Sequence, residues 1–526
     1  MSQAITPSMS IREIRSRYPS TIPVLEKFGL AECGGEEGPD EPLAWFATVH
    51  RLPLDEILAE VRGAALRDSE AKPPAARSSG PSKFPFSPHF LLGSLFLTLT
   101  LGATTGMVNL LRIGSGAEVP LSHKQIHGHT QVLGFAALFL MGIAYHAMPR
   151  ILGVGGGPPR TSKLVFWLMF FGVILRNAGQ PLGFFAAGRA MSLLSSALEV
   201  AGGILFSLFV FTLLRRASDG KYGKKDPLLR FVFAGNVCLI AMLVIDALQG
   251  LWLARHPETS LPGSLTEPFY FAGLYGFLLA WIYGFGNRVV SLFLGVGPAR
   301  KGTPEAALFA QAAGVAVYLA TFLPGVPGAA ALIGRDAGMA LVALSAIVYL
   351  AGCGFLWRKA AAPALSVRGA PTVAIRLAFG SLGVWAVLEL AGITVARLTA
   401  FPAQNPWWND AARHSFTIGF VTLLIIGMSF RIIPVFSGKR LWSPRLAYAT
   451  YALILLGVAM RLLQYPAAFH AKLYEAGSWM GVLVVVALLL FAVNLLKTLR
   501  SNTTPPAPIT IAAPKRPEFV SSLPVR

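Results

Sequence analysis

Charged residues are scarce in this sequence. Only 13% of the 526 residues are Asp, Glu, Lys or Arg, whereas 54% are hydrophobic. Soluble globular domains carry about 25% charged residues, so the composition excludes that class and predicts a polytopic protein whose main partner is the lipid bilayer. The net charge of +20 is not concentrated in one patch, because the basic residues alternate with apolar segments. Nucleic acid is therefore not an expected partner.

Cysteine is also scarce. Cys33, Cys238 and Cys353 lie far apart and form no Cys-x-x-Cys pair, which excludes a disulfide framework and a cofactor attached through such a pair. The first fifty residues contain no long apolar run, so no signal peptide is expected.

Long apolar segments dominate the rest of the chain. We expect twelve transmembrane helices within residues 89–500, at 89–111, 126–149, 164–186, 191–214, 228–253, 269–294, 306–323, 337–357, 373–398, 412–436, 445–465 and 475–498. Basic residues gather in the connections 215–230, 358–376 and 437–445. By the positive-inside rule, these connections and both termini face the cytoplasm.

The segments that flank this region have a different composition. Residues 1–70 predict a small soluble helical domain, in which Ser10 and Glu13 form a capping box that opens the first helix. Residues 71–88 are rich in Pro, Ser and basic residues and predict a linker. We expect residues 501–526 to be a disordered tail.

The transmembrane region contains an internal repeat. Shifted by 285 positions, His129 falls on His414, Gly134 on Gly419 and Gly142 on Gly427. A fainter copy lies midway, since an offset of 142 places Gly134 on Gly276 and Gly142 on Gly284. The fold expected from this period is all-α, a membrane bundle of three pseudo-symmetric four-helix units.

Ionisable residues inside the apolar segments follow the same repeat. An offset of 285 relates Arg176 to Arg461, and an offset of 143 relates Asp246 to Glu389. With the histidines, these intramembrane polar residues are expected at one depth near the outer surface. Such residues usually line a cofactor or a polar path.

The histidines indicate a haem site. Neutral imidazole is a common axial ligand of haem iron, and His129 and His414 are related helix positions that could supply two such ligands. We therefore predict a haem b held by His129 and His414, with Arg461 and Arg176 pairing with the propionates. His127 is a further cofactor ligand. His123 and His127 lie four residues apart and, with His129 and His414, are the candidate ligands for copper or a second haem.

Two stretches resemble a known superfamily. The first contains His127-Gly128-His129, Leu133-Gly134-Phe135, Gly142, Tyr145 and Pro149, and it resembles the second helix of haem–copper oxidase subunit I. The second contains His414, Gly419, Gly427-Met428, Arg431 and Gly438, and it resembles the late signature of NnrS-type proteins, haem- and copper-containing membrane proteins linked to nitric oxide response in denitrifying bacteria. The resemblance implies twelve helices, three-fold pseudo-symmetry and a haem near the outer face.

The first 70 residues resemble a small helical domain found at the front of iron-cluster-repair and redox-stress proteins. The pattern comprises Ile11-Arg12-Glu13-Ile14, Tyr18-Pro19, Val24-Leu25, Phe28-Gly29-Leu30 and Leu54-Asp55-Glu56-Ile57-Leu58. That family commonly has a cysteine pair after the glycine, whereas this chain has Cys33 alone.

The expected function is that of a haem-binding inner-membrane protein in nitric oxide response or detoxification, with nitric oxide, quinol or a redox subunit as candidate partners. No catalytic residue is identified. Catalytic haem–copper oxidases need three copper- or iron-binding histidines on helices 6 and 7, but this chain has Phe269-Tyr270-Phe271 on the sixth segment and no histidine on the seventh. Two alternatives stay open: a divergent nitric oxide reductase or oxidase subunit, and a haem-free transporter that uses Asp246, Glu389 and the two arginines.

Overall fold

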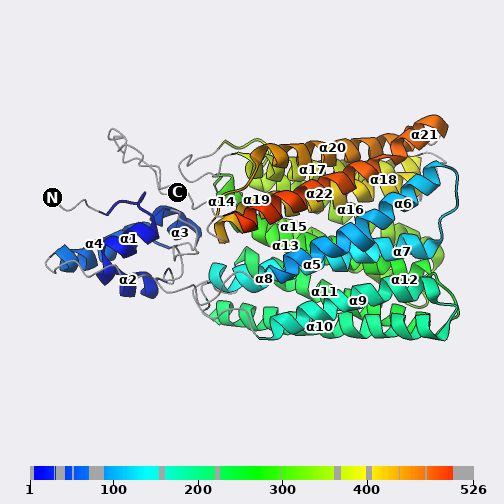
Figure 1. The fold of residues 1–526 in the computed structure, drawn as a ribbon, viewed down its shortest axis with the longest axis horizontal. Coiled ribbons are helices and arrows are strands. Elements are labelled where there is room, and N and C mark those ends of the chain that lie inside the picture. The colour runs from blue at the N-terminus through cyan, green and yellow to red at the C-terminus, as the bar shows by residue number, and fades with distance from the viewer. Residues whose placement is uncertain are drawn as a thin grey trace.

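The protein consists of a small N-terminal group of helices and a long helical bundle (Figure 1). The computed structural model describes residues 5–28, 30, 42–49, 52–69, 88–152, 154, 160–219, 226–297, 299–359, 369–398, 406–436, 439–467 and 471–501. Cys33 and nearly all of the expected linker and C-terminal tail lie outside the described residues.

The N-terminal group has its own apolar core. Its elements are α1 (Ile11–Arg17), the 3₁₀ turn η1 (Pro19–Thr21), α2 (Ile22–Lys27), α3 (Leu43–Val49) and α4 (Leu54–Ser69). The backbone N–H of Glu13 donates to Ser10 Oγ at 3.1 Å, which confirms the predicted cap. The fully buried core side chains are Ile11, Ile14, Leu25, Leu30, Leu43, Ile57 and Val61. Phe293 of the bundle packs against this core, so the two groups of helices touch.

The bundle contains three successive units. The first comprises α5 (His89–Leu97), η2 (Thr98–Gly102), α6 (Ala103–Gly114), α7 (Leu121–His129), η3 (Thr130–Ala137), α8 (Leu138–Ile151), α9 (Thr161–Gly179), η4 (Gln180–Leu182) and α10 (Ala186–Asp219). The second comprises α11 (Pro227–Arg255), α12 (Gly263–Phe271), η5 (Ala272–Leu278), α13 (Leu279–Phe285), η6 (Gly286–Val290), α14 (Ser291–Phe293), α15 (Thr303–Ala320) and α16 (Gly328–Cys353). The third comprises α17 (Ala370–Leu398), α18 (Pro406–His414), η7 (Ser415–Thr422), α19 (Leu423–Phe436), α20 (Pro444–Ala467), α21 (Ala471–Ser478) and α22 (Met480–Arg500).

Among the described residues, eleven helical segments are long and apolar enough to cross a membrane. The expected seventh span is α15, which has 18 residues and packs along α16. At 1.5 Å per residue, α15 is about 27 Å long, close to the ~30 Å hydrocarbon core of a bilayer. With α15, the chain traverses the bundle twelve times, and accordingly α5 begins and α22 ends at the end that carries α1–α4 (Figure 1).

The repeat is visible in the backbone. The second helix of each unit switches from α-helical to π-helical geometry at an equivalent residue, giving η3 after His129, η5 after Phe271 and η7 after His414. These starting points are separated by 142 and 143 positions. The structure therefore confirms the three pseudo-symmetric units.

Repeated glycines let neighbouring helices approach closely. A Cβ on Gly142 would lie 2.4 Å from the Cβ of Phe90, and one on Gly427 would lie 2.7 Å from the Cβ of Ala374. Gly284 makes the equivalent approach to Phe231. Each contact joins the second helix of a unit to its first, so small residues fix the packing where apolar driving force is weak in lipid.

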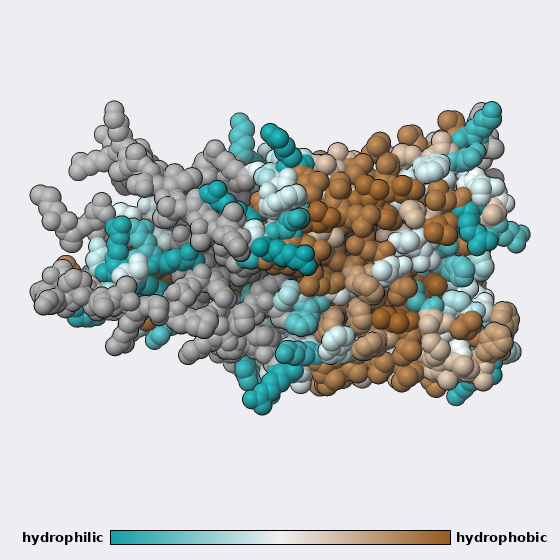
Figure 2. Space-filling view, in the orientation of Figure 1, coloured by the Kyte–Doolittle hydropathy of each residue, from teal (hydrophilic) through white to brown (hydrophobic). Residues whose placement is uncertain are grey.

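The outer surface of the bundle suits a bilayer. On the face shown in Figure 2, hydrophobic residues cover the middle of the bundle and hydrophilic residues lie toward its two ends. Large apolar side chains on this surface are exposed, among them Trp167, Phe171, Leu208, Phe233 and Val244. Such a surface is costly in water and favourable against lipid acyl chains, which supports a multi-pass membrane protein.

Candidate functional site

Most of the site residues predicted from the sequence fall into two places within the bundle. One is an open cavity of about 990 Å³, here called the cavity. The other is a closed group formed by His129, Glu199 and Asp246, here called the buried cluster. The sequence predicts a single gathering of histidines, carboxylates and arginines, but the structure distributes them between these two places.

The cavity lies among all three units, each of which supplies lining residues. Its ionisable lining residues are Lys124, His127, Glu267, Arg335, Asp336, Glu389, Asp410, Arg413, His414 and Arg461. The other lining residues are mainly apolar and aromatic. An apolar enclosure with a few convergent polar groups is typical of a cofactor or ligand site, and the volume is at the upper end of the usual range of about 300–1,000 Å³.

His127 is held firmly on the cavity wall. Its Nδ1 donates to the main-chain carbonyl of Gly102 at 2.9 Å, at the end of the π-helical segment η2. Gly106 makes room for the ring, since a Cβ there would lie 2.4 Å from His127 Cε1. The His127 Nε2 makes no hydrogen bond with another residue that the structure describes, so it is available as a ligand atom.

His414 has the same arrangement of ring nitrogens. Its Nδ1 donates to the main-chain carbonyl of Asp410 at 2.7 Å and also lies 3.2 Å from the Asp410 carboxylate. Asp410 forms an ion pair with Arg461 of α20. Within the described part of the chain, the Nε2 of His414 likewise makes no hydrogen bond or ion pair. A second hydrogen bond of this kind fixes the tautomer and orientation of a ligating imidazole.

The cavity also carries cationic side chains beside the histidines. Arg461 is almost fully buried and pairs with Asp410. Arg413, next to His414, lines the cavity, and its guanidinium makes no hydrogen bond or ion pair with another described residue. Guanidinium groups match carboxylates in shape and charge. The donor set therefore fits a haem: two imidazoles with free Nε2, and arginines for the propionates.

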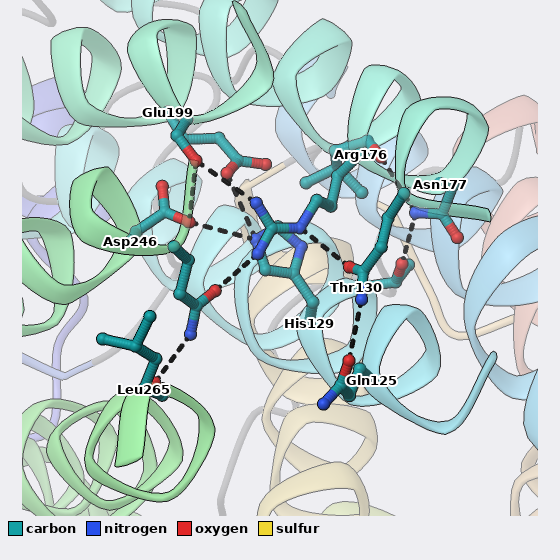
Figure 3. Close-up of polar contacts among 12 residues, drawn as sticks. Gln125, His129, Thr130, Arg176, Asn177, Glu199, Asp246 and Leu265 are labelled. Atoms are coloured by element: carbon teal, nitrogen blue, oxygen red, sulfur yellow. Dashed lines mark hydrogen bonds and ion pairs between the residues drawn. The ribbon is translucent and has the colours of Figure 1, made fainter. Parts of the chain in front are cut away.

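His129 lies in the buried cluster, not on the cavity wall. Figure 3 shows its ring facing the carboxylates of Glu199 and Asp246. His129 Nε2 is 3.2 Å from Glu199 Oε2 and 3.5 Å from Asp246 Oδ1. The side chain is 3% exposed and both carboxylates are 0% exposed. The structure thus brings His127, and not His129, to the cavity shared with His414.

Arg176 lies beside the buried cluster, and not at the cavity. Its guanidinium donates to Gln180, Ser196 and Gln249 at 3.1, 3.3 and 2.5 Å. Ser196 Oγ in turn donates to Asp246 Oδ1 at 3.3 Å. Figure 3 shows this guanidinium next to the ring of His129. Arg176 is therefore placed to act on the cluster and not on a cofactor in the cavity.

The remaining predicted residues divide in the same way. Glu389 lines the cavity and accepts a hydrogen bond from Trp385 Nε1 at 3.0 Å. Its repeat partner Asp246 belongs to the buried cluster. His123 is half-buried and belongs to neither place; its main-chain carbonyl accepts from Asn109 Nδ2 at 3.2 Å. Asp246 and Arg176 therefore lie at the buried cluster, whereas Glu389 and Arg461 lie at the cavity. Gln125, which lines the cavity, connects the two places through hydrogen bonds by way of Gln180 to Arg176.

Sequence reasoning from the repeat missed Glu199, Asp410 and Arg413. Glu199 has no acidic counterpart at either offset, since Leu341 and Val484 occupy those positions. Another signal could have found it: Glu199 is the only acidic residue in its apolar segment 191–214, and such residues are functional candidates by default.

Aromatic rings fill the region where the sixth transmembrane segment, α12 and η5, meets α15 of its own unit and the third unit. Phe271 stacks on Tyr318 of α15 with ring centroids 3.5 Å apart, and Tyr275 stacks on Trp385 of α17 at 5.1 Å. Phe416 packs edge-on against Tyr275 at 4.9 Å. This packing offers rings in place of the imidazoles that a second metal centre there would need.

The comparisons with known proteins agree with this fold. A solved structure titled "Cryo-EM structure of a heme-copper terminal oxidase dimer provides insights into its catalytic mechanism" superposes with a TM-score of 0.60. The match covers 79% of this chain and 84% of that one at 14% identity, and so shows a shared fold. No curated protein sequence matches. The family described as "NnrS protein" matches residues 82–502. The chain therefore belongs to the NnrS family.

Proposed function

We propose that the protein is a haem-binding redox protein of the bacterial inner membrane, with both termini in the cytoplasm, that acts in nitric oxide response or detoxification. The observation that carries the proposal is the matching pair His127 and His414. Each has Nδ1 bonded to a main-chain carbonyl and Nε2 free, and both line one cavity. In this proposal His127 takes the place that the repeat assigned to His129.

The cavity would hold haem b through His127 and His414, with Arg461 and Arg413 paired to its propionates. A haem with two imidazole ligands supplies a one-electron redox centre. The chain's own contribution is to orient the imidazoles through Gly102 and Asp410 and to enclose the group in apolar walls.

The family and the haem–copper oxidase-like fold support a membrane redox role. The nitric oxide role rests on the resemblance of the His414–Gly438 stretch to NnrS-type proteins, and quinol or a redox subunit is the proposed electron partner. The aromatic packing of Phe271, Tyr275 and Tyr318 favours this role over catalytic turnover at a second metal centre.

The test is a reduced-minus-oxidised optical spectrum of the purified full-length protein. We expect a sharp low-spin b-type signal that is lost in His127→Ala and kept in His123→Ala, a matched control four residues away. Nitric oxide added to the reduced protein should change this spectrum. Wild-type protein without haem, expressed with adequate haem supply, would contradict the proposal, and so would an unchanged spectrum in His127→Ala.

A further inference from the structure

The buried cluster leaves several polar atoms without the partners that burial normally requires. Both ring nitrogens of His129, both carboxylate oxygens of Glu199 and Oδ2 of Asp246 are buried and make no hydrogen bond. Native proteins seldom leave such atoms unsatisfied, because each one costs free energy. The carboxylates carry charge as well, which makes their burial more costly still.

The charges of the cluster are also unbalanced at close range. Two carboxylates share contact with one imidazole. Arg176 does not form an ion pair with either of them, because its guanidinium is taken by Gln180, Ser196 and Gln249. A divalent cation held by two carboxylates and a neutral imidazole would be electrically neutral within its own ligand set, with the Arg176 guanidinium outside that set.

The spacing of the three donor atoms fits a metal. His129 Nε2 lies 3.2 and 3.5 Å from the two nearest carboxylate oxygens, and one ligand atom from each residue lies within 4.8 Å of the others. For ligand atoms each about 2.1 Å from a metal, neighbouring ligands are about 3.0 Å apart in an octahedron and about 3.4 Å apart in a tetrahedron. Nε2 faces both oxygens without donating a well-formed hydrogen bond to either.

The surrounding helices hold the donors in place. Three helices supply them, α7, α10 and α11 (Figure 3). Phe269 stacks on the His129 ring with centroids 5.5 Å apart and planes 10° apart. The absence of a side chain at Gly172 of α9 leaves room for Glu199, since a Cβ on Gly172 would lie 2.5 Å from Glu199 Cγ. A preorganised set of donors on rigid helices is what a metal site needs.

We infer that His129, Glu199 and Asp246 bind a divalent first-row metal ion, separate from the haem proposed for the cavity. One imidazole and two carboxylates without a thiolate suit Mn²⁺, Fe²⁺ or Zn²⁺ and do not favour Cu⁺. The inference does not depend on the haem, because no residue of the buried cluster lines the cavity.

The first test is the metal content of full-length protein after incubation with Mn²⁺ and removal of loosely bound ions, measured by plasma mass spectrometry. We expect about one ion per chain, as for a mononuclear site. The double variant Glu199→Gln with Asp246→Asn should retain less than about a tenth of the wild-type metal content. Loss of a residue that only hydrogen-bonds to a metal ligand already lowers metal affinity about 10–100-fold. Asp226→Asn is the matched control, because Asp226 is a buried carboxylate paired with Arg288 at 2.7 Å, outside the cluster, and its metal content should not change.

Electron paramagnetic resonance of the Mn²⁺-loaded wild type gives a second measurement that needs no variant. Coupling to one imidazole nitrogen is expected. Absence of bound metal in wild type, absence of nitrogen coupling, or full retention by the double variant would each overturn the inference and leave a protonated His129 as the partner of the carboxylates.

A further variant separates this inference from the proposed function. His414→Ala should lose haem and keep the metal, whereas the double variant should lose the metal and keep the haem spectrum. If metal and haem disappear together in His414→Ala, the metal belongs to the cavity and the inference is wrong.

Discussion

His129 and His414 hold the same position in two copies of one structural unit, yet their surroundings differ. Each is the last residue before a π-helical segment, and each has an arginine nearby from the third helix of its unit. His129 is closed in between two carboxylates. His414 faces an open cavity of about 990 Å³.

The difference shows that a repeat specifies a backbone position and not the neighbours of the side chain. Glu199 contacts His129 from the fourth helix of the first unit. The equivalent residue in the third unit is Val484, which lines the cavity. A valine cannot engage the imidazole, so His414 keeps its Nε2 free for a ligand. This single difference, Glu199 in the first unit and Val484 in the third, distinguishes the closed polar cluster from the apolar wall of the cavity.

The largest expected effect is a loss of haem when His414 is removed, in contrast to the removal of His129. His414→Ala should lower the haem content by more than about tenfold, which corresponds to a loss above 1.4 kcal/mol, because an axial ligand is removed. His129→Ala should leave the haem content unchanged. A pyridine haemochrome assay on both variants measures this, and equal losses would contradict the division into two places.

The next effect concerns the glycine that accommodates His127. Gly106→Ala places a methyl group 2.4 Å from the ring; overpacking of this kind costs about 1–3 kcal/mol. Haem affinity should therefore fall by about 5- to 150-fold, measured by titrating haem into apoprotein. The control is Gly380→Ala, since a Cβ there has no neighbour within 4 Å. A similar loss in both variants would count against His127 as a ligand.

A smaller effect is expected at the group that orients His414. Asp410→Asn removes the charge that lies 3.2 Å from Nδ1 and pairs with Arg461. Such outer partners contribute about 10-fold or more to affinity, so haem affinity should fall by about 10-fold and the midpoint potential should change. Asp246→Asn, the comparison in the other place, should change neither quantity in a redox titration.

The smallest effect is expected at the paired arginines. Arg461→Lys keeps the charge but loses the planar fork that suits a carboxylate, so haem affinity should fall by roughly two- to fivefold, the size of a weakened ion pair. Arg176→Lys should leave haem affinity unchanged, because Arg176 lies beside the buried cluster. The same haem titration checks both variants, and a larger effect at Arg176 would reverse the comparison.

Much of the fold is predictable from the sequence because lipid imposes simple rules. Long apolar segments give the spans, and the offsets of Gly134, Gly276 and Gly419 give the three units. The Ser10 cap is equally local, since one hydroxyl meets the backbone three residues on.

The two polar places are less predictable, because they depend on which helix faces which. His127 and His129 are two residues apart, so about 200° of helix rotation separates them. The sequence identifies both as candidates, but the packing of Gly106 against His127 decides which one reaches the cavity. Glu199 was missed because the repeat, which selected the other candidates, does not include it.

The π-helical segments η3, η5 and η7 also bear on ancestry. A π-helical turn holds one residue more than an α-helical turn, so it is naturally created by a single inserted residue. The three segments begin at Thr130, Ala272 and Ser415, at equivalent places in helices whose side chains have since diverged. Three independent insertions at one position would be a large coincidence. One insertion made before the duplications accounts for all three segments, and an ancestral four-helix unit would then already have contained it.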